Sequence, residues 1–197
     1  MIKLPRPEFR GPPLEVVLTR RRSVRGFALQ PLELHQLGQL CFAAMGVTGS
    51  AASIPLRTTP SAGGLYPIEV YVVVNRVTGC EVGSYRYLPA AHALEPCAMG
   101  EHGPALTAAG LGQRCIGDAA VNFVFTAIPD RTRPRYKDLT ERYVNMEAGH
   151  AAQNVLLQAV SLGLGAVPIG AFRTSEVNKI VGVDGARENA IYLIPVG

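Results

Sequence analysis

The chain has 197 residues, of which 48% are hydrophobic and 17% are charged. This length suffices for one well-filled core and is short for two, and the composition excludes global disorder. No apolar run reaches the roughly 18 residues of a membrane span, and the Pro-rich start lacks the apolar stretch of a secretory signal. We therefore expect a soluble cytoplasmic protein with an extended arm over 1–13 and one domain over 14–197.

The basic residues are concentrated near the start of the chain. The net charge is +4, but residues 1–25 carry +5 and residues 26–197 carry −1. The excess lies mainly in the run TRRRSVRGF. In an extended stretch, Arg21, Ser23 and Arg25 would point to one side, as a site for a single phosphate group requires. A solvated tail and a nucleic-acid-binding arm are the alternatives for this run taken alone.

Two helices and a loop are expected before the first long strand. The helices are predicted over 14–22 and 31–46, the second with Pro31 in its first turn and Gly46 at its end. Residues 47–66 are small and polar, which predicts a loop. The end of this loop, TPSAGGLYPIE, has two adjacent glycines that leave backbone amides uncovered, so a flat ligand can approach closely. A simple turn is the alternative.

The middle of the chain is expected to form most of the sheet. IEVYVVVNRV, over 68–77, is rich in β-branched and aromatic residues, and SYRYL, over 84–88, follows after a turn. A short helix is expected over 103–112. AAVNFVFTAI, over 119–128, is almost continuously apolar, which is typical of a central strand. The polar segment RTRPRY, over 131–136, is expected to be a loop.

The last third of the chain begins with the longest predicted helix, over 139–162. Small or apolar side chains line two of its faces, which is typical of a helix that is buried or lies between subunits. The small apolar segment GLGAVPIGAF follows and can lie flush against a planar ring. A helix over 175–181 and a terminal strand, IYLIPVG, complete an α+β pattern of one sheet with helices packed on it.

Other motifs carry little information about chemistry. The four cysteines stand far apart without a C-x-x-C pair, so incidental thiols are the expected interpretation. Glu147 and His150 form one E-x-x-H unit, whereas a ferritin-like di-iron site needs two. We therefore expect no metal centre.

Three features described above bear on a ligand: the phosphate clamp in the arginine run, the amide-rich turn and the small apolar segment. Together they meet the needs of flavin mononucleotide (FMN).

The sequence resembles the FMN-dependent nitroreductase superfamily, and within it the azoline-oxidising dehydrogenases of thiazole and oxazole peptide biosynthesis. The matching segments occur in family order from about Leu14 to Gly197: RRSVRGF, PSAGGLYPIEVYVV, GSYRYLP, RYVNMEAGHAAQNVLLQAVSLGLGAVPIGAF and IYLIPVG. The resemblance implies a nitroreductase-like α+β fold with an antiparallel or mixed sheet. It also implies an intertwined homodimer with both FMN sites at the subunit interface.

The resemblance further implies roles for individual residues. The phosphate and ribityl chain of FMN would be held by Arg21, Arg22, Ser23 and Arg25. The flavin would be reached from the other subunit by Pro60, Ser61, Ala62 and Gly64. The isoalloxazine ring would be lined by Pro168, Ile169, Gly170 and Ala171. Tyr136 is a candidate proton donor, for which an exposed surface tyrosine is the alternative.

Three positions depart from the family pattern. Gly64 stands where typical nitroreductases have an asparagine. Arg135-Tyr136 stands where the azoline oxidases carry a Lys-Tyr pair that is important for their chemistry. Relatives often continue beyond the equivalent of Gly197 with an arginine that helps bind phosphate.

We expect an FMN-dependent oxidoreductase that passes a hydride between a reductant such as NAD(P)H and a small organic acceptor. The alternative within the enzyme class is an azoline-oxidising dehydrogenase of peptide modification. A further hypothesis is a protein that carries flavin but does not turn over a substrate. The alternative of another class is a basic-armed nucleic-acid-binding module, whose affinity would weaken steeply with salt. The near-neutral remainder of the chain argues against nucleic acid as the partner.

Overall fold

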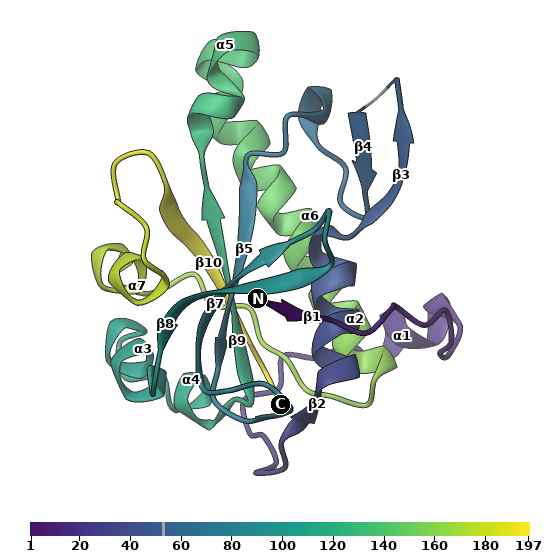
Figure 1. Cartoon of the computed structure of the whole chain (residues 1–197), viewed down its shortest axis with the longest axis vertical. Coiled ribbons are helices and arrows are strands. Elements are labelled where there is room, and N and C mark those ends of the chain that lie inside the picture. Colours follow the sequence, from purple (N-terminus) through teal and green to yellow (C-terminus); the bar gives the residue numbers. More distant parts are fainter. Residues whose placement is uncertain (53) are drawn as a thin grey trace.

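A six-stranded sheet forms the centre of the molecule (Figure 1). The computed structural model describes residues 1–52 and 54–197. Every pair of neighbouring strands in this sheet is antiparallel. In spatial order the strands are β1 (Ile2–Lys3), β8 (Ala93–Met99), β7 (Gly83–Leu88), β5 (Ile68–Val74), β9 (Val121–Ala127) and β10 (Asn189–Val196).

The central strands β5 and β9 are apolar on both faces of the sheet. Every residue of both strands is buried. Because side chains alternate along a strand, Val70 and Val72 belong to one core cluster, whereas Tyr71 and Val73 belong to the other. A sheet with two apolar faces must be covered on both, and helices cover it here.

One face of the sheet is covered by α2 (Leu34–Met45) and α6 (Thr140–Ser161). Leu37 and Leu40 of α2 are fully buried, and each such leucine contributes roughly 1.5–3 kcal/mol to folding. The small residue Ala151 on α6 is also fully buried in the same cluster. The predicted small-residue helix is therefore a core helix along this side.

The opposite face is covered by three shorter helices, α3 (Gly103–Ala109), α4 (Arg114–Asp118) and α7 (Thr174–Val181). Leu106 and Val177 are fully buried against the second core cluster. The architecture is α+β, with one sheet between two helical layers, and this confirms the predicted fold class.

The start of the chain is attached to the rest of the fold. β1 pairs with β8, and the N–H of Leu4 donates to the carbonyl of His92 at 3.0 Å. Further along, α1 (Leu14–Arg20) contacts α6. The arginine run thus begins beside the long helix. Among the described residues, no helix combines the length and apolar character needed to cross a bilayer.

The predicted start of the second helix was wrong. Residues Leu32–Glu33 form β2, which pairs in parallel with β6 (Val77–Thr78), so Pro31 precedes a strand and not a helical turn. The helix begins at Leu34. The backbone N–H of Glu33 donates to Oε1 of Gln36 at 2.9 Å, which satisfies a donor at the helix start.

Two predicted loops contain regular structure. Residues 47–66 include an antiparallel hairpin, β3 (Val47–Ala51) and β4 (Ile54–Arg57), and a short 3-10 turn, η1 (Ala62–Gly64); Ser53 lies outside the described residues. The segment RTRPRY lies across η2 (Pro129–Arg131) and α5 (Arg133–Tyr136). Short turns of this kind depend on tertiary contacts more than on local propensity.

The other predicted elements are confirmed with small shifts at their ends. The long helix α6 runs over Thr140–Ser161 against the predicted 139–162. Strand β8 was missed, because Pro96 interrupts its pattern and none of its residues beyond Leu94 is buried.

We expect Leu40→Ala to lower the free energy of unfolding by about 2–5 kcal/mol, because it opens a cavity in a fully buried position. Leu29→Ala is the matched control, since Leu29 is 79% exposed and should change stability by less than about 0.5 kcal/mol. Urea denaturation of both variants measures the difference. Equal losses in the two variants would contradict the assigned core.

Candidate functional site

The arginine run lies at the end of α1 and then extends along another segment of the chain. Ser23 forms a parallel bridge with Ala166, and the N–H of Val24 donates to the carbonyl of Ala166 at 3.0 Å. Arg21 is half-buried, and Arg22 and Arg25 are exposed. The run is therefore part of the folded structure and not a free tail.

The positive charge of this run is not compensated. Within the part of the chain that the structure describes, no acidic side chain lies at ion-pair distance from Arg21, Arg22 or Arg25. Nη1 of Arg22 donates to the carbonyls of Thr19 and Arg21 at 3.1 and 2.8 Å. Three guanidinium groups that are close in the sequence and have no carboxylate partner leave the local charge positive, which favours the binding of an anion.

The predicted ring-binding segment lies directly beside the arginine run. It runs along β10, where Ile169 and Leu193 exchange backbone hydrogen bonds of 2.8 and 3.0 Å. Ile169 is buried, Pro168 is half-buried, and Gly170 and Ala171 are exposed. The structure therefore brings two of the three predicted groups of site residues together.

A glycine makes this close contact possible. A Cβ atom built at Gly165 would lie 2.7 Å from Cγ1 of Val24, which is shorter than real contacts allow. A side chain at this position would have to displace the Val24 side chain, whose Cβ would lie only 2.9 Å away. The absence of a side chain at Gly165 thus leaves room for Val24 of the arginine run.

The third predicted group is the loop over 60–64, in which Pro60 is exposed and Ser61, Ala62 and Gly64 are half-buried. Gly63 and Gly64 have φ values of +65° and +66°, in the left-handed region that favours glycine. Oγ of Ser61 accepts a hydrogen bond from the N–H of Tyr66 at 2.8 Å.

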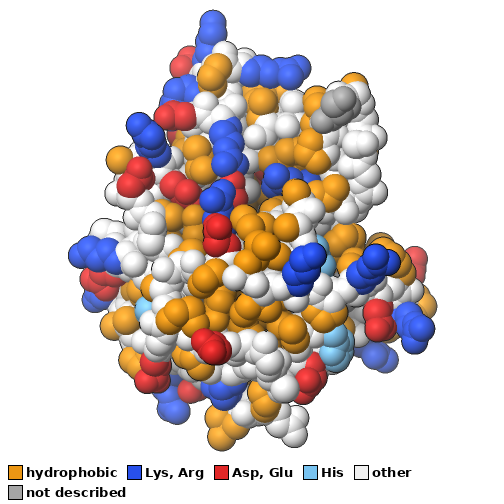
Figure 2. All heavy atoms as spheres, viewed as in Figure 1, with side chains coloured by type: hydrophobic (Ala, Val, Ile, Leu, Met, Phe, Trp, Pro, Cys, Tyr) orange, Lys and Arg blue, Asp and Glu red, His pale blue; other side chains and the backbone are white. Residues whose placement is uncertain are grey.

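Tyr136 and Arg135 lie against this loop. A Cβ atom built at Gly63 would be 2.8 Å from Nη1 of Arg135 and 3.0 Å from Oη of Tyr136. The guanidinium of Arg135 also lies 5.5 Å from the centre of the Tyr136 ring, and the ring of Tyr143 packs edge-on at 4.8 Å. Figure 2 shows basic side chains around α5 at the top of the molecule. The predicted proton donor is thus next to the amide-rich loop.

The loop and the arginine run lie toward opposite ends of α6. Gly63 lies beside Tyr136, whose ring packs against Tyr143 in the first turn of this helix, whereas the segment beside the arginines follows Leu162. The 19 residues from Tyr143 to Leu162 correspond to about 28 Å of helix. In Figure 1, η1 lies near α5 at the top, and α1 lies near the lower end of α6. One chain does not bring all three groups together.

Sequence reasoning did not identify Glu147 as part of this site. Glu147 is only 2% exposed, and its Oε1 atom has no hydrogen-bond partner among the described residues. Burial raises the pKa of its carboxyl to about 7, while hydrogen bonds from Ser61 and the Ile68 backbone and the charge of Arg57 act in the opposite direction. The sequence pattern that could have identified Glu147 is an acidic residue among small residues in the long helix.

A charged network borders the loop on its other side. Glu69 is buried and pairs with Nη2 of Arg131 at 2.6 Å and with Nη2 of Arg86 at 3.1 Å. Nη1 of Arg131 donates to the carbonyl of Tyr66 at 2.7 Å, and the guanidinium of Arg57 lies 4.3 Å from the Tyr66 ring centre. The network fixes the point where the loop enters β5.

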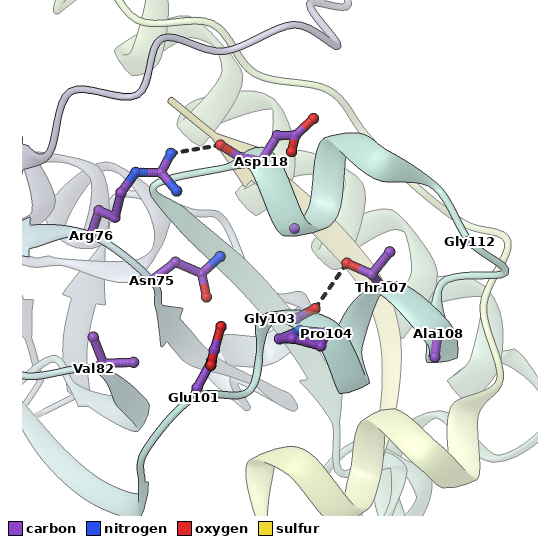
Figure 3. A pocket seen from close by; sticks show the side chains of 11 residues that line it. Asn75, Arg76, Val82, Glu101, Gly103, Pro104, Thr107, Ala108, Gly112 and Asp118 are labelled. Atoms are coloured by element: carbon purple, nitrogen blue, oxygen red, sulfur yellow. Dashed lines mark hydrogen bonds between the residues drawn. The ribbon is translucent and has the colours of Figure 1, made fainter.

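A cavity of about 980 Å³ lies elsewhere, against α3 and α4 (Figure 3). Nη2 of Arg76 donates to the carbonyl of Asp118 at 2.7 Å, and the hydroxyl of Thr107 donates to the carbonyl of Gly103 at 2.8 Å. None of the predicted site residues lines it. Its volume alone does not make it the candidate site.

The sequence pattern of the nitroreductase family matches residues 18–197. The chain belongs to the nitroreductase family. A protein of Methanocaldococcus jannaschii that is named as a nitroreductase is 44% identical over 184 residues, which cover 93% of this chain and 90% of that protein. The microcin B17-processing protein McbC of Escherichia coli is 29% identical over 133 residues, which cover 65% of this chain and 49% of McbC.

Solved structures agree with this family. A crystal structure of a protein from Ralstonia eutropha that is named as a nitroreductase matches this chain with a TM-score of 0.85 and 34% sequence identity. The match covers 100% of this chain and 88% of that one. The microcin synthetase McbBCD complex of E. coli has a TM-score of 0.77 at 24% identity, covering 90% and 69% of the two chains. The NADPH:FMN oxidoreductase of Vibrio harveyi has a TM-score of 0.66 at 20% identity, covering 93% and 66%. The last two likenesses show the fold, and family membership makes the chain a nitroreductase-type oxidoreductase.

We expect the stability of the protein to fall between about pH 4.5 and pH 7 because of Glu147. The folded state holds the proton more tightly than the unfolded chain, so the contribution is complete below the unfolded pKa and is lost as the pH rises to about 7. A shift of this size corresponds to about 3 kcal/mol. Urea midpoints from pH 4 to pH 8 should show a smaller loss in Glu147→Gln than in the wild type. Parallel curves for the two proteins would refute the assignment.

Proposed function

We propose that the protein is an FMN-dependent oxidoreductase that passes a hydride between a reductant such as NAD(P)H and a small organic acceptor. The observation that carries this proposal is the backbone pairing of Ser23 with Ala166. This pairing places guanidinium groups that have no acidic partner beside the small apolar segment GLGAVPIGAF. A phosphate linked to a planar ring needs these two surfaces side by side.

The residues present fit FMN. Its phosphate would be held by Arg21, Arg22, Ser23 and Arg25, whose three guanidinium groups and one hydroxyl match a doubly charged anion. Its ring would lie along Pro168, Ile169, Gly170 and Ala171. When bound, FMN supplies the hydride chemistry, and the protein supplies orientation, charge and the exclusion of water.

We further propose that the working form is a homodimer. Two copies with antiparallel α6 helices would place the loop over 60–64 of one copy beside the arginine run of the other. Exposed apolar side chains on the elements concerned support this arrangement: Ile54 and Leu56 on β4, Val24 in the arginine run, and Leu139 and Met146 at α6 are 37–53% exposed. Pro60, Ser61, Ala62 and Gly64 would then complete each site.

Tyr136 is the proposed proton donor at the substrate face. Its Oη lies beside Gly63, in the loop that would contact the flavin. A half-buried phenol at this point can hold a proton near the acceptor while the ring of Tyr143 fixes its orientation.

The second candidate function is azoline oxidation in peptide modification. It is supported by the sequence relation to McbC and by the position of Arg135-Tyr136 against the amide-rich loop. Turnover with NAD(P)H and nitroaromatic or quinone acceptors supports the first function. Turnover of an azoline substrate with oxygen supports the second.

We expect Arg25→Ala to weaken FMN binding about 10-fold to 100-fold, because a charge-assisted hydrogen bond to the phosphate is lost. Arg187→Ala is the matched control, since Arg187 is exposed on the loop after α7. Fluorescence titration of the apoprotein with FMN measures both affinities. Wild-type protein that binds no FMN, or equal affinities in both variants, would overturn the proposed phosphate site.

A further inference from the structure

We propose that Arg135 determines specificity for the acceptor, and that the acceptor carries a carboxylate or phosphate group beside an apolar part. The inference rests on the proposed FMN function and deepens it, because it names the chemical class of the acceptor. It concerns an exposed side chain on α5, which the proposed phosphate site does not use.

The charged end of Arg135 is held against the loop over 60–64. A Cβ atom built at Gly63 would lie 2.8 Å from Nη1 of Arg135 and 3.2 Å from its Cζ, so the guanidinium packs against this glycine. The same guanidinium is 5.5 Å from the centre of the Tyr136 ring. The side chain is therefore exposed, but its charge lies over the loop that would contact the flavin.

The charge of Arg135 has no acidic partner. Within the described part of the chain, no carboxylate lies at ion-pair distance from its guanidinium. A second arginine on the same helix differs, because Arg133 pairs with Asp130 at 3.1 Å and with Glu141 at 3.5 Å. The acidic residues nearest in the fold are thus occupied, and Arg135 is left to bind an anion from outside.

The surroundings of α5 are basic as a whole. Residues 129–142 contain five basic and three acidic side chains, which is a net charge of +2. Figure 2 shows basic side chains around α5 at the top of the molecule. A negatively charged acceptor that approaches this end of the molecule meets a favourable field.

The loop contacts an apolar side chain toward β4. A Cβ atom built at Gly64 would lie 3.3 Å from Cγ2 of Ile54, and Ile54 is 46% exposed. In Figure 1, η1 lies between α5 and β4. An acceptor on this loop would therefore meet a cation toward α5 and a hydrocarbon surface toward β4. This combination fits a molecule with one charged and one apolar part.

An arginine is well suited to recognise such an anion. Its planar guanidinium donates two parallel hydrogen bonds to a carboxylate or a phosphate. Contacts with Gly63 and the Tyr136 ring already restrict the side chain of Arg135, so less conformational entropy is lost on binding. The bound anion would also bring the acceptor next to Tyr136, the proposed proton donor.

The test compares three nitroaromatic acceptors that differ in charge: 4-nitrobenzoate, 4-nitrophenyl phosphate and the neutral 4-nitrobenzamide. Each is titrated into the FMN-loaded protein without a reductant, and the absorbance change of bound FMN gives its dissociation constant. We expect the wild type to bind one of the two anions about 10-fold more tightly than the amide, because charge-assisted hydrogen bonds are added. The anion that binds more tightly distinguishes a carboxylate from a phosphate. Arg135→Gln should bind all three compounds with similar affinity.

Arg133→Gln is the matched control, because it removes the same charge from the same helix at a guanidinium that is already paired. It should keep the preference of the wild type. If the FMN-loaded wild type prefers neither anion, or if both variants lose the preference equally, the role of Arg135 is refuted while the proposed function stands. If the folded wild type binds no FMN, the proposed function fails and the inference fails with it.

Discussion

The length of α6 is the constraint on which the candidate site depends. This helix has 22 residues and separates the loop over 60–64 from the arginine run by most of its length. One helix cannot bring its own ends together, so the proposed anion site at one end and the amide-rich turn at the other would meet only between two chains. The small buried residues of α6 let α2 and the sheet pack closely against it.

The apolar character of β5 and β9 places this helix. Because both strands are buried on both faces, the sheet requires a helical layer on each side, and α6 is the longest element available. The segment that follows α6 then returns along β10 and pairs with Ser23. A core-packing requirement thus fixes where uncompensated positive charge meets an apolar segment. Solved structures at 34% and 20% sequence identity share this fold, with TM-scores of 0.85 and 0.66.

The sequence alone predicted the parts of the fold that have strong patterns. Continuous apolar runs indicated β5 and β9, and small residues on two faces indicated α6. The β3–β4 hairpin and β8 were missed because VTGSA and ALEPCAM lack alternation and form strands through their partners. The positions of Glu147 and Glu69 could not be predicted, because burial and ion pairing of a carboxylate depend on segments that are distant in the sequence. The site residues carried over by resemblance remain predictions.

Mixed dimers test most directly the claim that each site is built from two chains. One chain would carry Arg21→Ala and Arg25→Ala, and the other would carry Gly63→Val, which strains a position at φ +65° and fills the space beside Arg135. Each variant alone should bind little FMN. If the site is shared, a mixed dimer contains one intact site and one doubly damaged site, so it should bind one FMN per dimer. Mixed dimers that bind no more FMN than either parent would contradict the account.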